Sequence, residues 1–288
     1  MVIALVLVAI VVAATIYFVL PLRQSVDVAT RAELTDTADN ALQRIGRDVR
    51  LSLPNSVRTD GTRLEFIPVR SAGRYRASSS GAACDTGTDE LAFDVTDTCF
   101  KSIGTVSNAS TIGPPNADFL VLNNYGSGFA GQDAYATSGT LNRRLITTAA
   151  NEGSRERIVY SPNTALDRTL HDSPGKRFFI VGGNTTTGLP EPVTYECNAA
   201  PSGGTLTRRW GYTMLASQPT TPAQFAAGAG TSAVIANDVT GCSFNYDQNG
   251  IAPQVGLLTL QLTLGLTVSG GQSETVTLYH SIHVNNVP

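Results

Sequence analysis

The sequence predicts an α+β fold in which one long N-terminal helix packs on a C-terminal antiparallel β domain with long loops. Three features of the chain support this. An uncharged apolar run fills residues 1–22, an amphipathic helical pattern follows it, and most of the remaining chain alternates with the period of two that is typical of strands. We therefore expect three parts, at residues 1–22, 23–54 and 55–288.

Residues 1–22 are predicted to form the transmembrane half of the helix. A helix rises about 1.5 Å per residue, so this run would span about 33 Å, which is enough for the ~30 Å hydrocarbon core of a bilayer. A cleaved secretory signal and a buried core helix are the alternatives. The run is longer than a signal core, and it has no basic segment before it and no small-residue cleavage site after it.

Residues 23–54 are predicted to form the amphipathic half of the same helix. Apolar and small residues recur at spacings of three and four, with charged residues between them. Pro54 should end the helix, because the residue before a proline avoids the α conformation. The face expected to pack on the β domain carries Ala38, Leu42, Ile45 and Val49.

Residues 55–288 are predicted to form a β-rich domain outside the cytoplasm. Short runs with strand periodicity are separated by clusters of Gly, Pro, Asn and Ser. Long surface loops are expected at 70–89, 102–117, 125–153 and 215–237.

The clearest strand signal is a long hairpin near the C-terminus, whose turn is Ser269–Gln272. An antiparallel hairpin with one apolar face needs a cover over that face. The amphipathic half of the helix is the expected cover. The predicted hairpin core consists of Leu260, Leu262, Leu264, Val276, Leu278 and Ile282.

Composition limits the classes of partner. The formal net charge is −3 and 15% of the residues are charged, so no basic tract points to nucleic acid. Four cysteines permit three disulfide pairings. Proximity in sequence favours Cys84–Cys99 and Cys197–Cys242, and such bonds persist in oxidising compartments. A zinc site is the alternative, but no CxxC pair is present.

No catalytic residue or cofactor is predicted, and we expect the protein not to be an enzyme. The consecutive residues His171, Asp172 and Ser173 cannot converge as a hydrolytic triad. His280 falls on the apolar face of the last strand, where a core or interface role is expected. Trp210, Tyr212 and Tyr195 could form a carbohydrate-binding surface, although core packing is the simpler interpretation.

An acidic cluster provides weak calcium candidates at Asp85, Asp89 and Glu90. The spacing of an EF-hand loop is absent, and a solvated strand edge is the other interpretation. We therefore predict no metal site.

Taken together, this arrangement resembles the type IV pilin and pseudopilin family over essentially the whole chain. The run MVIALVLVAIVVAATI is similar to the segment that follows the prepilin processing site, and ALQRIGRDVRLSLPNSVR is similar to the helix end of the larger minor pilins and J-type pseudopilins. Near the C-terminus, similarity to a minor pilin of the mannose-sensitive haemagglutinin pilus is carried by RFFIVGG, VTYEC, VTGCSFNYD, GLLTLQLTL and HVNNVP.

The chain departs from the family pattern at its start. A basic leader, the glycine at the peptidase site, the following phenylalanine and the glutamate at the fifth mature position are not present. If the resemblance holds, these residues are expected upstream of Met1.

The resemblance implies a minor pilin-like structural subunit of a type IV (mannose-sensitive haemagglutinin-type) pilus that initiates or caps the filament. Implied partners are other major and minor pilins through the N-terminal helix, the inner-membrane pilus assembly machinery and membrane lipid. The implied location is a single-pass inner-membrane protein with a periplasmic C-terminal domain, which then moves to the pilus. The alternatives are a J-type pseudopilin of a type II secretion system and, from another class, a membrane-anchored adhesin or carbohydrate-binding domain.

Overall fold

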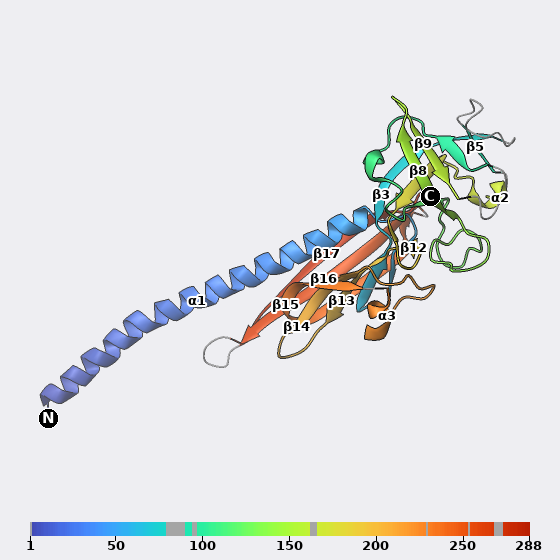
Figure 1. Cartoon of the computed structure of the whole chain (residues 1–288). Coiled ribbons are helices and arrows are strands. Elements are labelled where there is room, and N and C mark those ends of the chain that lie inside the picture. The colour runs from blue at the N-terminus through green and yellow to red at the C-terminus, as the bar shows by residue number, and fades with distance from the viewer. Residues whose placement is uncertain are drawn as a thin grey trace.

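The computed structural model describes residues 2–78, 90–93, 97–161, 166–228, 230–252, 254–267 and 273–288. Within these ranges, the side chains of residues 2, 5, 13, 14, 16–27, 78, 249–252 and 267 are also left out of the description. Helix α1 (Val2–Arg50) leads into a β body, and Figure 1 shows the helix projecting well past the sheets, with the N-terminus at its far end. The C-terminus lies within the β body.

The larger sheet of the described residues has seven antiparallel strands. Alternate residues of its last three strands are apolar and point to one face, so that face is buried by α1. The strand order is β1 (Arg58–Thr59), β2 (Arg63–Phe66), β13 (Val193–Asn198), β14 (Gly204–Trp210), β15 (Thr231–Ala252), β16 (Val255–Thr267) and β17 (Ser273–Asn285).

A second antiparallel sheet of six described strands lies at the end of α1 away from the N-terminus (Figure 1). It has its own apolar cluster, which contains Phe100, Phe178 and Ile180. Its strand order is β3 (Val69–Arg74), β10 (Arg177–Val181), β7 (Phe119–Leu122), β8 (Arg143–Asn151), β9 (Glu156–Tyr160) and β6 (Cys99–Lys101).

Short elements complete the described part of the fold. Two strand pairs are β11 (Gly183–Asn184) with β12 (Leu189–Pro190), and the parallel pair β4 (Arg76–Ser78) with β5 (Glu90–Ala92). The short helices are α2 (Arg168–His171), α3 (Pro222–Ala226) and the 3₁₀ turn η2 (Ala109–Thr111). A third apolar cluster includes Leu53, Ile67 and Met214 together with Phe119 and Val121 of β7.

The predicted fold class is wrong. Strands make up 44% of the structure and helices 19%, so the protein is mostly β rather than α+β. Among the residues that the structure describes, no helix has the long apolar character predicted for a pilin helix. In α1, the apolar side chains that the structure describes form only a short exposed run at Ile3–Val12, with a gap at residue 5. Crossing a bilayer takes about 20 consecutive apolar residues.

The predicted location is corrected by the same observation. Within the described ranges, no helix combines the length and the apolar character that a membrane span requires. The assignment of residues 1–22 as a transmembrane half, and with it a single-pass inner-membrane location, is therefore not supported.

All four predicted loops contain some regular structure, and the interval 102–117 contains the short helix η2. The interval 70–89 begins within β3 and includes β4, 125–153 contains β8, and 215–237 contains α3 and the start of β15. Strand β8 escapes a periodicity search because it begins with Arg143 and Arg144, whose side chains are buried. Two adjacent arginines suggest a surface loop when only the sequence is considered.

Candidate assembly interface

The C-terminal part of α1 is anchored in the core of the larger sheet. Its buried side chains follow spacings of three and four, which places them on one face of the helix. This face lies on β15, β16 and β17. The buried residues are Leu34, Ala38, Ala41, Leu42, Ile45 and Val49.

Gly46 marks the closest approach of α1 to the sheet. A Cβ atom at this position would lie 3.3 Å from Nε2 of His280 and 3.5 Å from Cδ1 of Ile282, both on β17. A glycine inside a helix costs about 1 kcal/mol relative to alanine. Here it lets the helix seat directly on the strand, and it gives His280 a packing role against α1.

A polar contact fixes the last turn of α1. Asp48 accepts a hydrogen bond from the Tyr195 hydroxyl at 2.7 Å and pairs with Nε of Arg208 at 3.1 Å. Burial raises the pKa of the Tyr195 phenol, and its hydrogen bond to Asp48 acts in the same direction. The phenol therefore stays protonated and acts as a donor that holds the end of the helix against β13 and β14.

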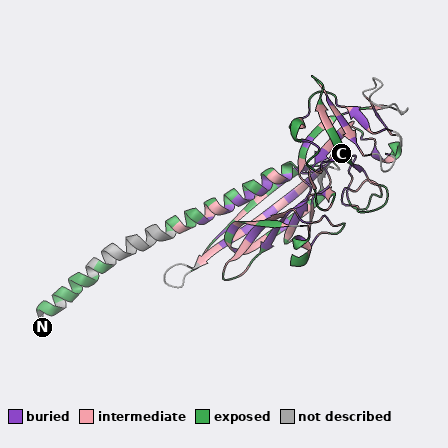
Figure 2. Cartoon of the chain, viewed as in Figure 1, coloured by how far each residue is buried: buried purple, intermediate pink, exposed green. Residues whose placement is uncertain are grey.

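The N-terminal part of α1 has the opposite character. We call residues Ile3–Val12 the apolar tip. Val6–Val12 is an unbroken run of seven exposed residues, all of them apolar. Seven residues make nearly two helical turns, so apolar side chains point in every direction around the axis. The large side chains of the tip are between 50% and 77% exposed, and Figure 2 shows this end of the helix as exposed.

The structure places the residues predicted for packing as follows. Ala38, Leu42, Ile45 and Val49 lie in the buried face of α1. Opposite them, β16 and β17 pair without interruption, with Leu262 beside Leu278 and Leu264 beside Val276. Leu278 is partly buried, whereas the buried members of the predicted hairpin core are Leu260, Leu262, Leu264, Val276 and Ile282.

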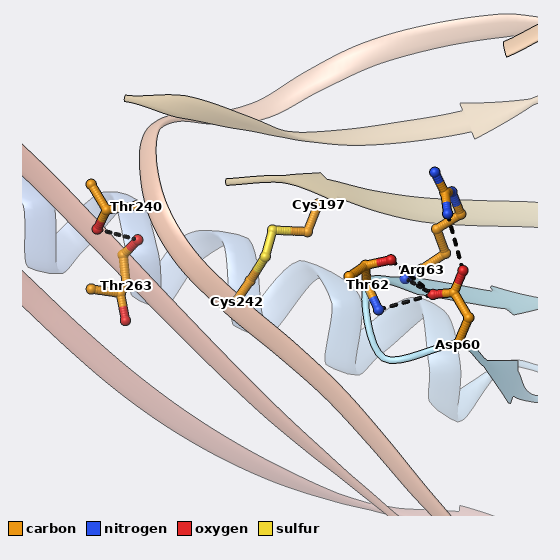
Figure 3. Close-up of a disulfide and its surroundings, with 7 residues drawn as sticks. All are labelled: Asp60, Thr62, Arg63, Cys197, Thr240, Cys242 and Thr263. Carbon is orange, nitrogen blue, oxygen red and sulfur yellow. Dashed lines mark hydrogen bonds and ion pairs between the residues drawn. A yellow bond between two sulfur atoms is a disulfide. The ribbon is translucent and has the colours of Figure 1, made fainter. Parts of the chain in front are cut away.

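The Cys197–Cys242 disulfide is present and joins β13 to β15 (Figure 3). These strands are separated by β14 in the sheet order. Strand β14 begins at Gly204, so it does not extend alongside the part of β15 that contains Cys242. In that part, β15 approaches the β1–β2 turn, where the Phe244 amide donates to the Gly61 carbonyl at 2.9 Å. The disulfide therefore fastens the sheet where it curls.

The other predicted pairing, Cys84–Cys99, lies partly outside the described residues. Cys99 opens β6 and is disulfide-bonded, whereas Cys84 lies outside the described residues. Of the calcium candidates, Asp85 and Asp89 also lie outside the described residues, and Glu90 is the first residue of β5. In the part of the chain that is described, no three His, Cys, Asp or Glu side chains gather to hold a metal ion.

The residues considered for catalysis or carbohydrate binding serve mainly in packing. The His171 ring is buried and bonds to the backbone on both sides. Tyr195 and Tyr212 are buried, and Trp210 is partly buried with the Arg208 guanidinium 5.2 Å from its ring. An open hollow of ≈490 Å³ lies within the loop at residues 128–140, and Asp133 is the ionisable side chain among the described residues that line it.

A buried polar cluster was missed by sequence reasoning. Glu65 is fully buried, pairs with Nε of Arg58 at 2.9 Å and accepts a hydrogen bond from the Tyr212 hydroxyl at 3.0 Å. Burial raises the pKa of Glu65, and Arg58 opposes that shift. Arg58 also lies 3.6 Å from the centre of the Tyr135 ring. In the sequence, Glu65 occupies the polar position of an alternating strand, so nothing there distinguishes it from a surface residue.

Comparisons of the chain with protein-family models, with curated proteins and with solved structures found no match.

Proposed function

We propose that this chain is a structural subunit of a filament of the type IV pilus or pseudopilus kind, a minor subunit rather than the repeating one. The observation that carries the proposal is the apolar tip, which is helical, exposed and apolar on all sides. The similarity of the N- and C-terminal segments to minor pilins supports the same assignment.

The exposure of the tip argues for an apolar protein partner. Burying one large aliphatic side chain contributes about 1.5–3 kcal/mol, and the tip exposes several in succession. A helix that is apolar all round is normally enclosed on every side. Helices of neighbouring subunits provide such an enclosure, because side-chain ridges on one helix pack into grooves on the next.

The β body suits the outer part of such a filament. It is joined to α1 by both apolar packing and the Asp48 contact, so a load on the helix would pass into the larger sheet. The Cys197–Cys242 disulfide suits an oxidising environment. The size of the body and its long connections favour an initiating or capping position over a tightly repeating one.

Charged substitutions in the tip test this proposal. In cells that make the filament, Val8→Lys and Val11→Lys should lower the amount of this subunit that co-isolates with sheared filaments by at least tenfold. A lysine in the helical core would leave a buried unpaired charge. The matched control is Glu33→Lys, at an exposed position in the anchored part of α1. Wild-type recovery of both tip variants, with equal expression, would contradict the proposal.

A further inference from the structure

Strand β17 forms an edge of the larger sheet and is unusually regular. It pairs with β16 over 13 consecutive residue pairs, without a register shift. The preceding pair, β15 with β16, has two register shifts. A long regular edge presents a row of backbone N–H and C=O groups that an additional strand could pair with.

The pairing register identifies which backbone groups face outward. The Asn286 amide donates to the Gln254 carbonyl at 2.9 Å, and these two residues continue the register that pairs Asn285 with Val255. In an antiparallel ladder, residue pairs alternate between bonded and non-bonded. The even-numbered residues of β17 therefore bond to β16. The N–H and C=O groups that point away from β16 belong to the odd-numbered residues, which are Ser273, Thr275, Thr277, Tyr279, Ser281, His283 and Asn285.

Helix α1 leaves this edge open. It packs on the face of the even-numbered residues, where Gly46 lies against His280 and Ile282 and where Val276 and Val284 join the same core cluster. The outward backbone groups lie in the plane of the sheet instead. Across the described residues, no hydrogen bond joins the backbone of these seven odd-numbered residues to any other element.

The usual protection of an edge strand is also missing. Natural edges carry lysine, proline, a bulge or an inward-pointing charge that prevents pairing with another chain. Strand β17 has no lysine, arginine or proline, and its one carboxylate, Glu274, is at its start. Its odd-numbered side chains are exposed, and none of Thr275, Thr277, Tyr279 and Ser281 is charged. Tyr279 is 69% exposed at the centre.

We propose that β17 binds an extended segment of another polypeptide, which adds to the larger sheet as a further strand. The alternating donors and acceptors of the edge specify a polypeptide backbone, since only an extended backbone repeats both groups at this spacing. The uncharged polar face of β17 specifies a segment with small hydroxyl or amide side chains on the same face. A segment that places a charge beside Tyr279 gains no ion pair there.

This site is independent of the proposed filament function. It uses the free edge of the β body, whereas filament assembly is assigned to the apolar tip of α1. Substitutions in the tip should leave strand addition unchanged, and substitutions in β17 should leave the packing of α1 unchanged, so the two can fail separately.

Proline and alanine at one position provide a matched pair of variants. Ser281→Pro removes an outward N–H while every bond to β16 is retained, and proline is tolerated on edge strands for this reason. Ser281→Ala removes the side chain and keeps the N–H. The probe is a fluorescent 13-residue peptide with the sequence of residues 273–285, added to the full chain. The peptide should bind the wild type, Ser281→Ala should change the Kd by less than twofold, and Ser281→Pro should weaken binding at least tenfold.

Hydrogen exchange of the full wild-type chain tests the same proposal without any variant. In the dilute chain, the amides of Thr277, Tyr279 and Ser281 should exchange rapidly, while those of Leu278 and His280 are protected. Addition of the peptide should protect the odd-numbered amides. Protection of those amides by concentration alone, removed by Ser281→Pro, would support the proposal with a second copy as the partner. Failure of the peptide to bind, or equal effects of proline and alanine, would overturn it.

Discussion

At the scale of single residues, His171 is a fixed connection between a loop and a short helix. Its Nδ1 accepts a hydrogen bond from the Asp167 amide at 2.8 Å, and its Nε2 donates to the Gly131 carbonyl at 2.8 Å. Both bonds require the neutral ring with its proton on Nε2. Burial lowers the pKa of His171, which favours the same neutral form. The ring therefore holds the loop at residues 123–142 against α2.

This geometry predicts a pH-dependent stability. Because the folded pKa lies below the ordinary value of 6.5, the unfolded chain binds the proton more readily between these two pKa values. The stabilisation that depends on neutral His171 should therefore be complete above pH 6.5. The free energy of unfolding should fall as the pH decreases from 6.5 toward the folded pKa. Urea titrations at a series of pH values measure this. His171→Gln should flatten the dependence in that range, and an unchanged slope in the variant would assign the effect to other groups.

At the scale of elements, α1 has one part packed on the larger sheet and another part exposed to solvent. Leu34–Val49 carries a buried stripe, whereas the apolar tip is exposed on every side. The buried stripe packs on the apolar face of β15–β17. The described side chains of the tip are exposed and are not covered by the described part of the chain. Stability and assembly should therefore respond to substitutions in different parts of this helix.

Truncation of the buried stripe should weaken folding strongly. Ile45 is fully buried among sheet residues, so Ile45→Ala should lower the free energy of unfolding by about 2–5 kcal/mol through lost burial and an unfilled cavity. Val28 lies on the same helix and is 70% exposed. Val28→Ala should change the free energy by less than about 0.5 kcal/mol. Equal losses in both variants would mean that α1 is not seated as described.

The Cys197–Cys242 disulfide adds a covalent link within the same sheet. It closes a loop of 45 residues between β13 and β15. In the chain-entropy model, such a loop contributes about 4 kcal/mol by restricting the unfolded chain. The double variant Cys197→Ser with Cys242→Ser should lose a free energy of this order in denaturant titrations. A loss below about 1 kcal/mol would show that the curl of the sheet is held by its other contacts.

At the scale of the whole molecule, the larger sheet combines strands that are far apart in the sequence, from residues 58–66 and from residues 193–285. Strand β2 pairs with β13, about 130 residues later, as in Glu65 with Thr194. The alternation within each strand is local and is visible in the sequence, as in the hairpin of β16 and β17. The order of strands depends on distant pairings that local periodicity does not encode. Hence strands with clear alternation, such as β16 and β17, could be predicted, whereas β8 and the division into two sheets could not.

The candidate site was predictable to a similar extent. The buried stripe of α1 follows from helical periodicity, because each spacing of three or four is visible within a few residues. The role of Gly46 depends on its distance to His280, more than 200 positions away. Glu65 and Arg143 have the residue types of a surface, and only tertiary burial distinguishes them. The membrane assignment is not supported, because the apolar side chains that the structure describes at the start of α1 form a run too short to cross a bilayer.

Photo-crosslinking from the apolar tip tests directly whether this end of α1 packs against other filament subunits. A benzophenone amino acid placed at Leu7 or Val11 in the full chain, irradiated in cells that assemble the filament, should form adducts with the helices of other filament subunits. The same group at Arg47, which is exposed beside the β body, should form few. Adducts from Leu7 and Val11 to lipid alone, or to no protein, would contradict the assignment of this helix to subunit packing.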